Sequence, residues 1–227
     1  LESIWQTAKN DDKCNVYVIP IPYYDRDSIG KLPVFHYEGN DFPAYVPIHD
    51  YKSYVISARK PDIIYIHNPY DAYNRVTSIA PEYYSDKLKK YTDMLVYIPY
   101  YIAGLYIKRE AAANKVLTMG VKNANQIIVQ SEKYKKIFVN CGLKKEVVQA
   151  MGTPKIDIIN QEVYSEEWEG KIKEKKAVLI NFTLITLLSD DVSLDRYEKV
   201  VHQLLERNIF IIWRGHPLME ATLYSIR

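Results

Sequence analysis

The chain has 227 residues, of which 48% are apolar and 26% are charged. Its 30 Lys and Arg residues stand against 28 Asp and Glu, so the formal net charge at pH 7 is +2. This balance excludes an intrinsically disordered chain, because enough apolar area can be buried to offset the entropy of ordering. It also argues against a nucleic-acid binder that relies on a strongly basic surface. Two counts are unusual: 21 tyrosines and only 8 glycines.

The two cysteines, Cys14 and Cys141, are too few and too far apart for a disulfide framework or a local zinc site, so we interpret them as free thiols. No apolar run reaches the ~20 residues that a membrane-spanning helix needs. No signal peptide is recognisable. These features predict a cytoplasmic protein. Because the sequence begins at Leu1 inside a helical pattern, we expect it to be a piece of a longer protein.

The first 60 residues predict a helix, a strand and a long tyrosine-rich insertion. Apolar residues at positions 1, 4, 5 and 8 follow the spacing of one helix face. Residues 15–21 (NVYVIPI) are rich in β-branched and aromatic residues, which predicts a strand ending at Pro20 and Pro22. Residues 22–60 show little periodicity, and connections of this length are often functional.

From residue 61 onward, short apolar runs alternate with helical patterns. We predict strands over 62–66, 94–98, 126–130, 147–151, 177–182 and 209–213, and helices over 82–91, 108–119, 132–141 and 193–207. Ser131 stands at a predicted helix N-cap, and Gly120 and Gly142 stand at predicted C-caps. Leu194, Tyr197, Val201, Leu204 and Leu205 are the predicted inward positions of the last helix.

This alternation is typical of βαβ units and predicts an α/β fold with a mostly parallel sheet. We divide the chain into a Rossmann-like domain at 1–160 that contains the insertion at 22–60, a charged linker at 161–176, and the start of a second Rossmann-like domain at 177–227. In open α/β sheets, ligands bind beyond the carboxyl ends of the strands. We therefore expect the functional site where polar clusters follow the predicted strands.

The first such cluster, residues 67–71 (HNPYD), follows the strand at 62–66. His67 and Asp71 are candidates for a general base, and Asn68 and Tyr70 for substrate contacts. The alternative is an Asn-Pro turn in which His67 and Asp71 satisfy local backbone groups.

The second cluster follows the strand at 147–151 and contains Gly152, Thr153, Lys155 and Asp157. Glycine permits a close backbone approach, and Thr153 and Lys155 suit a phosphate at a helix start. The alternative is a plain turn in which Pro154 opens a helix.

The third cluster, residues 214–217 (RGHP), follows the strand at 209–213. Arg214 and His216 side by side suit a diphosphate or a transferred phosphate. The alternative is a turn that opens the next helix through Pro217. The sequence contains no GxGxxG, GxxxxGK[ST], HExxH, CxxC or GxSxG motif. The simplest forms of dinucleotide oxidoreductase, P-loop ATPase, zinc protease and serine hydrolase are therefore excluded.

Seven segments in order carry a family resemblance: VYVIPIPYYD (16–25), HYEG (36–39), PDIIYIHNPYD (61–71), MLVYIPY (94–100), IIVQSE (127–132), GTPKID (152–157) and WRGHP (213–217). Together they resemble the CDP-glycerol glycerophosphotransferase family of teichoic acid synthesis, in a distant clostridial-type branch. The family's HGT turn is absent here, and residues 98–104 (IPYYIAG) stand near its position. The sequence ends before the family's T-D-Y-S-S segment is reached.

The resemblance implies a GT-B fold, in which two Rossmann-like domains face each other across a cleft. Glycerol phosphate would pass from CDP-glycerol to a membrane-linked glycan or polymer. Gly152, Pro154 and Asp157 match the family's G-x-P-x-x-D segment at the domain junction. Arg214, His216 and Pro217 match its R-x-H-P segment, which implies that Arg214 and His216 steady the donor's diphosphate.

We therefore expect a CDP-glycerol-dependent glycerophosphotransferase that acts in teichoic acid or related cell-surface polymer synthesis. Its expected location is the cytoplasm, with peripheral contact to the inner face of the cell membrane left open. No cofactor beyond the donor substrate, no metal and no nucleic-acid partner are expected. The alternatives are a GT-B glycosyltransferase that uses a nucleotide sugar and a non-catalytic GT-B-like binding module. The expected catalytic residues are His67, Asp71 and His216, and the expected substrate contacts are Asn68, Tyr70, Gly152, Thr153, Lys155, Asp157 and Arg214.

Overall fold

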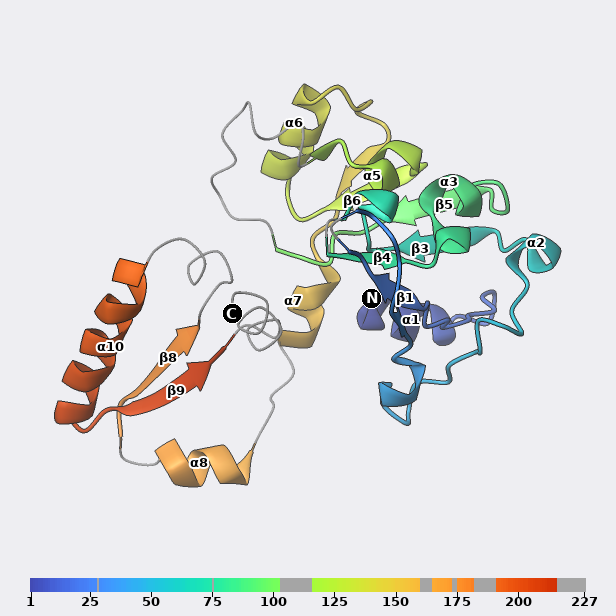
Figure 1. Ribbon diagram of the computed structural model, residues 1–227. Helices are drawn as coiled ribbons and strands as arrows, with labels where there is room; N and C mark the ends of the chain where they lie inside the picture. The colour runs from blue at the N-terminus through green and yellow to red at the C-terminus, as the bar shows by residue number, and fades with distance from the viewer. Residues whose placement is uncertain are drawn as a thin grey trace. The chain divides into compact units, whose positions relative to one another are not determined.

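The computed structural model of the chain divides into two compact units, Leu1–Gln161 and Glu162–Arg227, and each is described by itself (Figure 1). The structure describes residues 1–27, 29–74, 76–102, 116–159, 165–172, 175–181 and 191–215. Most of the helix predicted over 108–119 lies outside these residues.

A four-stranded parallel sheet forms the centre of the first unit. Its order is β3 (Ile63–Ile66), β5 (Met94–Tyr97), β6 (Gln126–Val129) and β7 (Val148–Ala150). All three neighbouring pairs are parallel. Each strand lies within a range predicted from its short apolar run, which is typical of strands buried in parallel sheets. The predicted α/β fold with a parallel sheet is therefore confirmed.

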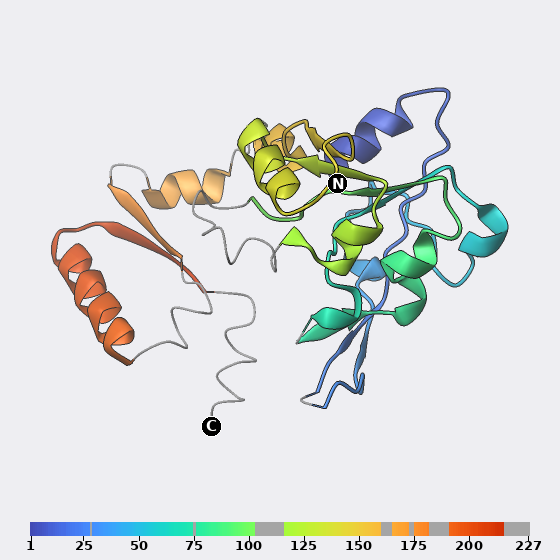
Figure 2. The same cartoon turned by 90° about the horizontal axis from the view of Figure 1, so that it is seen from above.

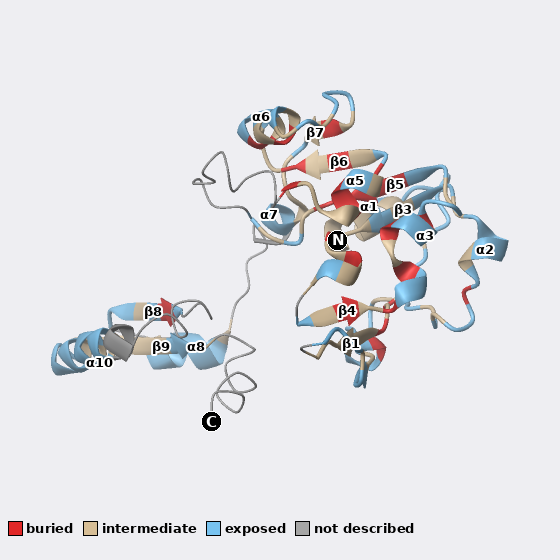
Figure 3. Cartoon of the chain, turned by 45° about the horizontal axis from the view of Figure 1, so that its top comes forward, coloured by how far each residue is buried: buried red, intermediate tan, exposed pale blue. Residues whose placement is uncertain are grey.

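The core of this unit follows the sheet (Figure 3). Leu95, Ile127 and Val148, on three neighbouring strands, are 0% exposed. Leu95 packs with Ala80, Tyr83 and Leu88, whereas Tyr97 belongs to a second cluster around β6 and β7. Strand β5 thus contributes to both clusters. Along the chain, α3 (Ser85–Leu88) precedes β5, α5 (Met119–Asn123) precedes β6 and α6 (Glu132–Asn140) precedes β7. Helix α7 (Pro154–Ile159) follows β7.

The N-terminal helix α1 (Glu2–Lys9) confirms the helix predicted from positions 1, 4, 5 and 8. The strand predicted over 15–21 is wrong, since Val18 makes only an isolated bridge with Ile48. Pro20 and Pro22 lack the N–H groups that a strand ladder requires, and this outweighs the β-branched composition.

A second sheet, which we did not predict, uses part of the tyrosine-rich insertion. Its order is β2 (Phe35–His36), β1 (Tyr23–Asp25) and β4 (Thr77–Ile79), and both pairs are antiparallel. These strands have two or three residues each, too few to show an alternating pattern in the sequence. The insertion also contains a 3₁₀ helix, η1 (Gly39–Asp41), and the short helix α2 (Ile56–Arg59).

The predicted helix ends are partly correct. Gly142, with φ of 103°, follows the end of α6 as predicted. Ser131 occupies the N-cap of α6, although its side chain makes no capping hydrogen bond. The prediction for Gly120 is wrong, because this residue lies within α5. The helix predicted over 82–91 is shorter, with α3 preceded by the 3₁₀ helix η3 (Pro81–Tyr83).

The second unit contains α8 (Glu166–Ile172), β8 (Ala177–Asn181), α10 (Asp191–Glu206) and β9 (Phe210–Arg214). Helix α8 lies inside the segment predicted as a linker. Strands β8 and β9 pair in parallel, and α10 lies along β9 in both views (Figures 1 and 2). The predicted inward position of Leu205 is wrong, since this side chain is 57% exposed. The neighbouring Leu204, turned by about 100° around the helix, is half-buried.

Within the described part of the chain, every helix is too short or too polar to span a membrane.

The central position of Leu95 leads to a stability prediction. Leu95→Ala should lower the free energy of unfolding of this unit by about 2–5 kcal/mol, because it leaves a cavity in a close-packed core. Met94→Ala, at the neighbouring and 39% exposed position of the same strand, should cost less than about 1 kcal/mol. Urea unfolding followed by circular dichroism measures both. Equal losses in the two variants would contradict the packing described here.

Candidate functional site

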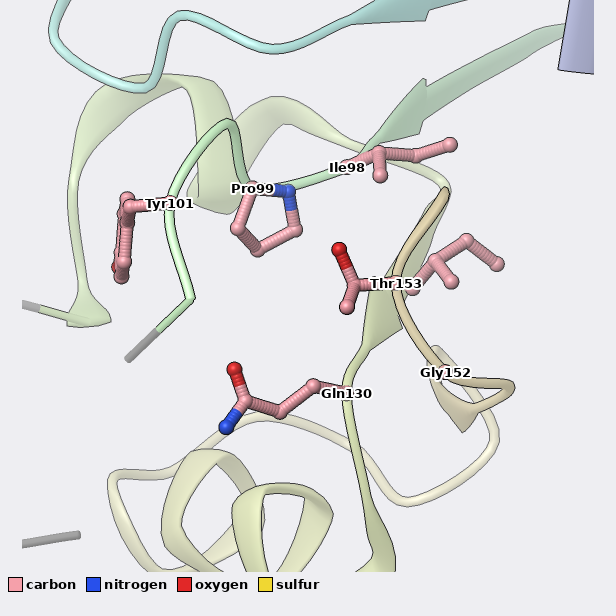
Figure 4. Close-up of a pocket in the computed structure, with 7 residues that line it drawn as sticks. Ile98, Pro99, Tyr101, Gln130, Gly152 and Thr153 are labelled. Carbon is pink, nitrogen blue, oxygen red and sulfur yellow. The ribbon is translucent and has the colours of Figure 1, made fainter. Parts of the chain in front are cut away.

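The carboxyl ends of the four parallel strands meet at one edge of the first unit's sheet. Residues 67–71 follow β3, residues 98–101 follow β5, Gln130 follows β6, and residues 151–153 follow β7. This is the edge at which open α/β sheets bind ligands. A small open pocket, with room for about one water molecule, lies there (Figure 4). It is lined by Ile98, Pro99, Tyr101, Ile128, Gln130, Gly152 and Thr153.

The turn after β3 is held by its own hydrogen bonds and by α5. The backbone N–H of Tyr70 donates to Asn68 Oδ1 at 2.9 Å, which closes an Asx turn. The N–H of Gly120 donates to the Pro69 carbonyl at 2.9 Å. A Cβ on Gly120 would lie 3.0 Å from both the Asn68 carbonyl oxygen and Pro69 Cα. The close approach of α5 to this turn therefore explains why residue 120 is a glycine, although it is not the predicted helix cap.

Asp71 is the buried anchor of this turn. Its side chain is 4% exposed and its φ is 49°, in the left-handed region. Both carboxylate oxygens accept the Ser85 N–H at 3.2 Å, and one also accepts the Ser85 hydroxyl. Asn123 Nδ2 donates to the same hydroxyl at 2.7 Å. These contacts connect the turn to α3 and α5, and they favour a structural role for Asp71 over a role as base.

Burial raises the pKa of the Asp71 carboxyl, and the hydrogen bonds from Ser85 only partly oppose this effect. Removing the carboxylate from water therefore costs more free energy than the hydrogen bonds from Ser85 return.

His67, directly after β3, has no hydrogen-bond or ion-pair partner among the residues that the structure describes. Part of its side chain is open to solvent, yet the surrounding protein atoms desolvate the ring and lower its pKa. A neutral imidazole with a free ring nitrogen can accept a proton. His67 is therefore the residue of the 67–71 cluster that remains available for chemistry.

A group of tyrosines surrounds the end of β5. The rings of Tyr100 and Tyr101 are 5.3 Å apart. Desolvation, followed by a hydrogen bond with Tyr70, raises the pKa of Tyr100 to about 12. Desolvation also raises the pKa of Tyr97 and of Tyr101. At neutral pH these side chains are therefore uncharged phenols, which can form hydrogen bonds to a ligand but cannot act as anions.

The second predicted cluster is divided by the structure. Gly152 and Thr153 line the pocket, whereas Lys155 and Asp157 lie exposed on α7 and do not. Gly152 has a φ of 95°, and its N–H donates to the Val129 carbonyl at 3.3 Å. That N–H is thus already engaged, and α7 has only six residues. This geometry does not provide the phosphate cradle that the spacing suggested.

The third predicted cluster lies in the second unit. Arg214 is the exposed last residue of β9 and pairs in register with Asn181. His216 lies outside the described residues. The structure therefore brings the first cluster and part of the second to one edge, and it leaves Arg214 in a different unit.

Five of the pocket residues were not among the predicted site residues, and three of these, Pro99, Tyr101 and Gln130, lie beyond the end of a strand. Each follows a strand of the parallel sheet, so the strand-end rule applied to β5 and β6 would have found them. Among the described residues, no group of His, Cys, Asp or Glu side chains is arranged to hold a metal ion.

Comparison of the chain with protein-family models, with curated proteins and with solved structures gave no match.

The environment of His67 leads to a first prediction for the site. Because desolvation lowers its pKa, His67 should titrate with a midpoint below 6.5. NMR detection of the imidazole resonances between pH 4.5 and 8 measures this, and His67→Asn assigns the signal by its disappearance. A midpoint above 6.5 would contradict the desolvated environment.

The buried carboxyl of Asp71 leads to a second prediction. Its pKa in the folded state lies above the ordinary value of 3.8, so the native state holds this proton more tightly than the unfolded state. Its contribution to stability should therefore be largest below pH 3.8 and should fall as the pH rises through the folded-state pKa. Asp71→Asn removes this titration. The stability of the wild type minus that of the variant should therefore decrease with pH in urea unfolding between pH 3 and 7. A difference that grows with pH would contradict the assignment.

Proposed function

We propose that this protein is a CDP-glycerol-dependent glycerophosphotransferase of the GT-B type, acting in the synthesis of teichoic acid or a related cell-surface polymer. The observation that carries the proposal is the carboxyl edge of the parallel sheet, where His67 has no hydrogen-bond or ion-pair partner among the described residues and lies on the same edge as a small pocket. The identity of the donor and the type of reaction are inferred from the seven segments that resemble the family.

In this reaction His67 accepts the proton of an acceptor hydroxyl. The hydroxyl oxygen then forms a bond to the phosphorus that carries glycerol, and the bond from that phosphorus to the bridging oxygen breaks. CMP leaves with the electron pair of that bond. Arg214 and His216 offset the charge that develops on the diphosphate, and catalysis rests on positioning and electrostatic stabilisation.

The charge properties of the residues support this division of roles. His67 is a neutral base, because its pKa is lowered. Arg214 is exposed and carries a permanent charge suited to a diphosphate. Because the acceptor is membrane-linked, the protein would act at the inner face of the cell membrane.

Turnover of CDP-glycerol by the full-length protein tests the proposal. His67→Ala and His216→Ala should each reduce kcat by about 10²–10⁴-fold, the range of a lost acid–base or charge-stabilising group. His202→Ala is the matched control, since His202 is an exposed residue of α10 beside Glu198 and should leave turnover unchanged. Undiminished turnover in both test variants would contradict the assigned roles.

Calorimetry on the same protein separates the competing functions. Binding of CDP-glycerol and CDP without binding of nucleotide sugars supports the proposal. Binding of nucleotide sugars alone indicates a glycosyltransferase, and no nucleotide binding indicates a non-catalytic module.

A further inference from the structure

The hairpin of β1 and β2 ends in large apolar side chains that the fold leaves exposed. Ile29, in the turn between the two strands, is 74% exposed. Val34 and Phe35, on the returning arm, are exposed as well. Val76 lies on the other side of β1, where its carbonyl accepts the Arg26 N–H at 2.8 Å, and it is also exposed. We call Ile29, Val34, Phe35 and Val76 the apolar end of this small sheet. Exposed apolar side chains that gather in one place mark a contact with a protein or a membrane.

The apolar end projects from the first unit and is apolar on both faces. Figure 2 shows the hairpin extending away from the rest of this unit. Phe35 packs edge-on against Tyr24, with 5.5 Å between the ring centroids. Consecutive residues of an extended segment point to opposite faces, so Val34 lies on the other face. A protein surface would cover one face of such a hairpin, whereas lipid surrounds an inserted end on every side. The two-sided arrangement therefore favours a membrane.

The backbone of the turn is paired within the hairpin. Asp27 Oδ1 accepts the N–H groups of Ile29 at 3.1 Å and of Lys31 at 2.7 Å. The Asp27 carbonyl accepts the Gly30 N–H at 3.0 Å, and the Asp27 N–H donates to the Lys31 carbonyl at 3.0 Å. Arg26 Nη1 donates to the Gly30 carbonyl at 3.3 Å. Backbone groups that enter lipid must be paired internally, because no water is available to them there. These hydrogen bonds allow the turn to leave water without losing them.

The charges of the hairpin also suit a lipid surface. Its two acids, Asp25 and Asp27, balance its two cations, Arg26 and Lys31. Asp25 Oδ2 lies 3.0 Å from His36 Nε2, and Asp27 is engaged by the turn. The exposed ammonium of Lys31 has no partner among the described residues. A lysine in this position keeps its alkyl chain against apolar groups and its charge at the level of the lipid phosphates.

We propose that the apolar end of the β1–β2 hairpin inserts into the interfacial region of a lipid bilayer, with Ile29 deepest and Lys31 at the phosphate groups. Short apolar elements that enter this region bind in proportion to the apolar area they bury. The inference deepens the proposed function and rests on it for the membrane concerned, because a membrane-linked acceptor requires the protein to reach the lipid surface. The partner is the lipid itself, and the contacting element lies outside the strand-end site.

Co-sedimentation of the 227-residue chain with vesicles of equal parts phosphatidylethanolamine and phosphatidylglycerol tests the contact. The chain should bind, and Ile29→Ser should weaken partitioning about tenfold, since burying one large apolar side chain is worth roughly that factor or more. Phe42→Ser is the matched control, because Phe42 is an exposed apolar residue of the same insertion outside the hairpin, and it should leave partitioning unchanged. Thermal unfolding of Ile29→Ser should match the wild type, since so exposed a side chain contributes little to packing.

Raised ionic strength distinguishes apolar insertion from attraction between charges. Salt screens the attraction between exposed charges but does not weaken the burial of apolar area. Binding should therefore persist at raised ionic strength. Binding that disappears under these conditions would overturn the apolar contact.

Fluorescence reports the depth of the turn directly. Relative to the wild type, Ile29→Trp should show additional emission that shifts to the blue when vesicles are added. Lipids brominated on their acyl chains should quench this additional emission. Emission from Ile29→Trp that vesicles leave unchanged would overturn the insertion.

Absence of vesicle binding by the wild type, or equal binding by Ile29→Ser, would also overturn the proposal. A concentration-dependent dimer in sedimentation velocity that Ile29→Ser dissociates, without vesicle binding, would establish a protein contact in its place. Failure of the proposed function is distinguishable from these results. Vesicle binding that depends on Ile29, in a full-length protein that does not turn over CDP-glycerol, would retain the membrane contact and reject the transferase. Turnover without vesicle binding would do the reverse.

Discussion

The structure of the first unit depends on the burial of strand β5 between two parallel neighbours. Leu95, Val96 and Tyr97 of this strand are each at most 4% exposed. A strand buried in this way must satisfy its backbone through its neighbours, so its pairing with β3 and β6 sets their register. Because every pair is parallel, the chain leaves each strand at the same edge. The pocket and the turn that carries His67 are consequences of this single arrangement.

The polar residues at that edge divide into those that the fold uses and those that it leaves available. Asn68 closes its own turn, and Asp71 pairs with Ser85 in the interior. Both hold the loop in place, and neither has its main acceptor atoms free. His67 and Thr153 stand on the same sheet edge without such partners among the described residues. Burying a polar group costs free energy, and the fold has compensated the buried Asp71 carboxylate in this way. Thr153 Oγ is buried without a partner among the described residues, whereas the side chain of His67 is exposed to solvent.

The two units carry residues of different chemical character. The pocket of the first unit has no charged residue in its described lining and is bordered mainly by apolar side chains. The second unit presents Arg214, a permanent cation, at the end of β9. A group transfer from a charged donor to a hydroxyl acceptor requires both kinds of surface. The proposed function assigns His67 to the acceptor hydroxyl and Arg214 to the diphosphate of the donor.

The sequence by itself determined the parallel sheet, because the apolar runs of β3, β5, β6 and β7 are signals local to each strand. It also placed the candidate residues at strand ends, since the order of elements fixes which residues follow a strand. It did not reveal the small antiparallel sheet, whose two- and three-residue strands are held by partners distant in the chain. Only the tertiary structure decided that Asp71 is buried against Ser85, that Gly120 packs against Asn68 and Pro69, and that Lys155 lies outside the pocket. These outcomes depend on which surfaces meet across the fold, and a one-dimensional pattern does not carry that information.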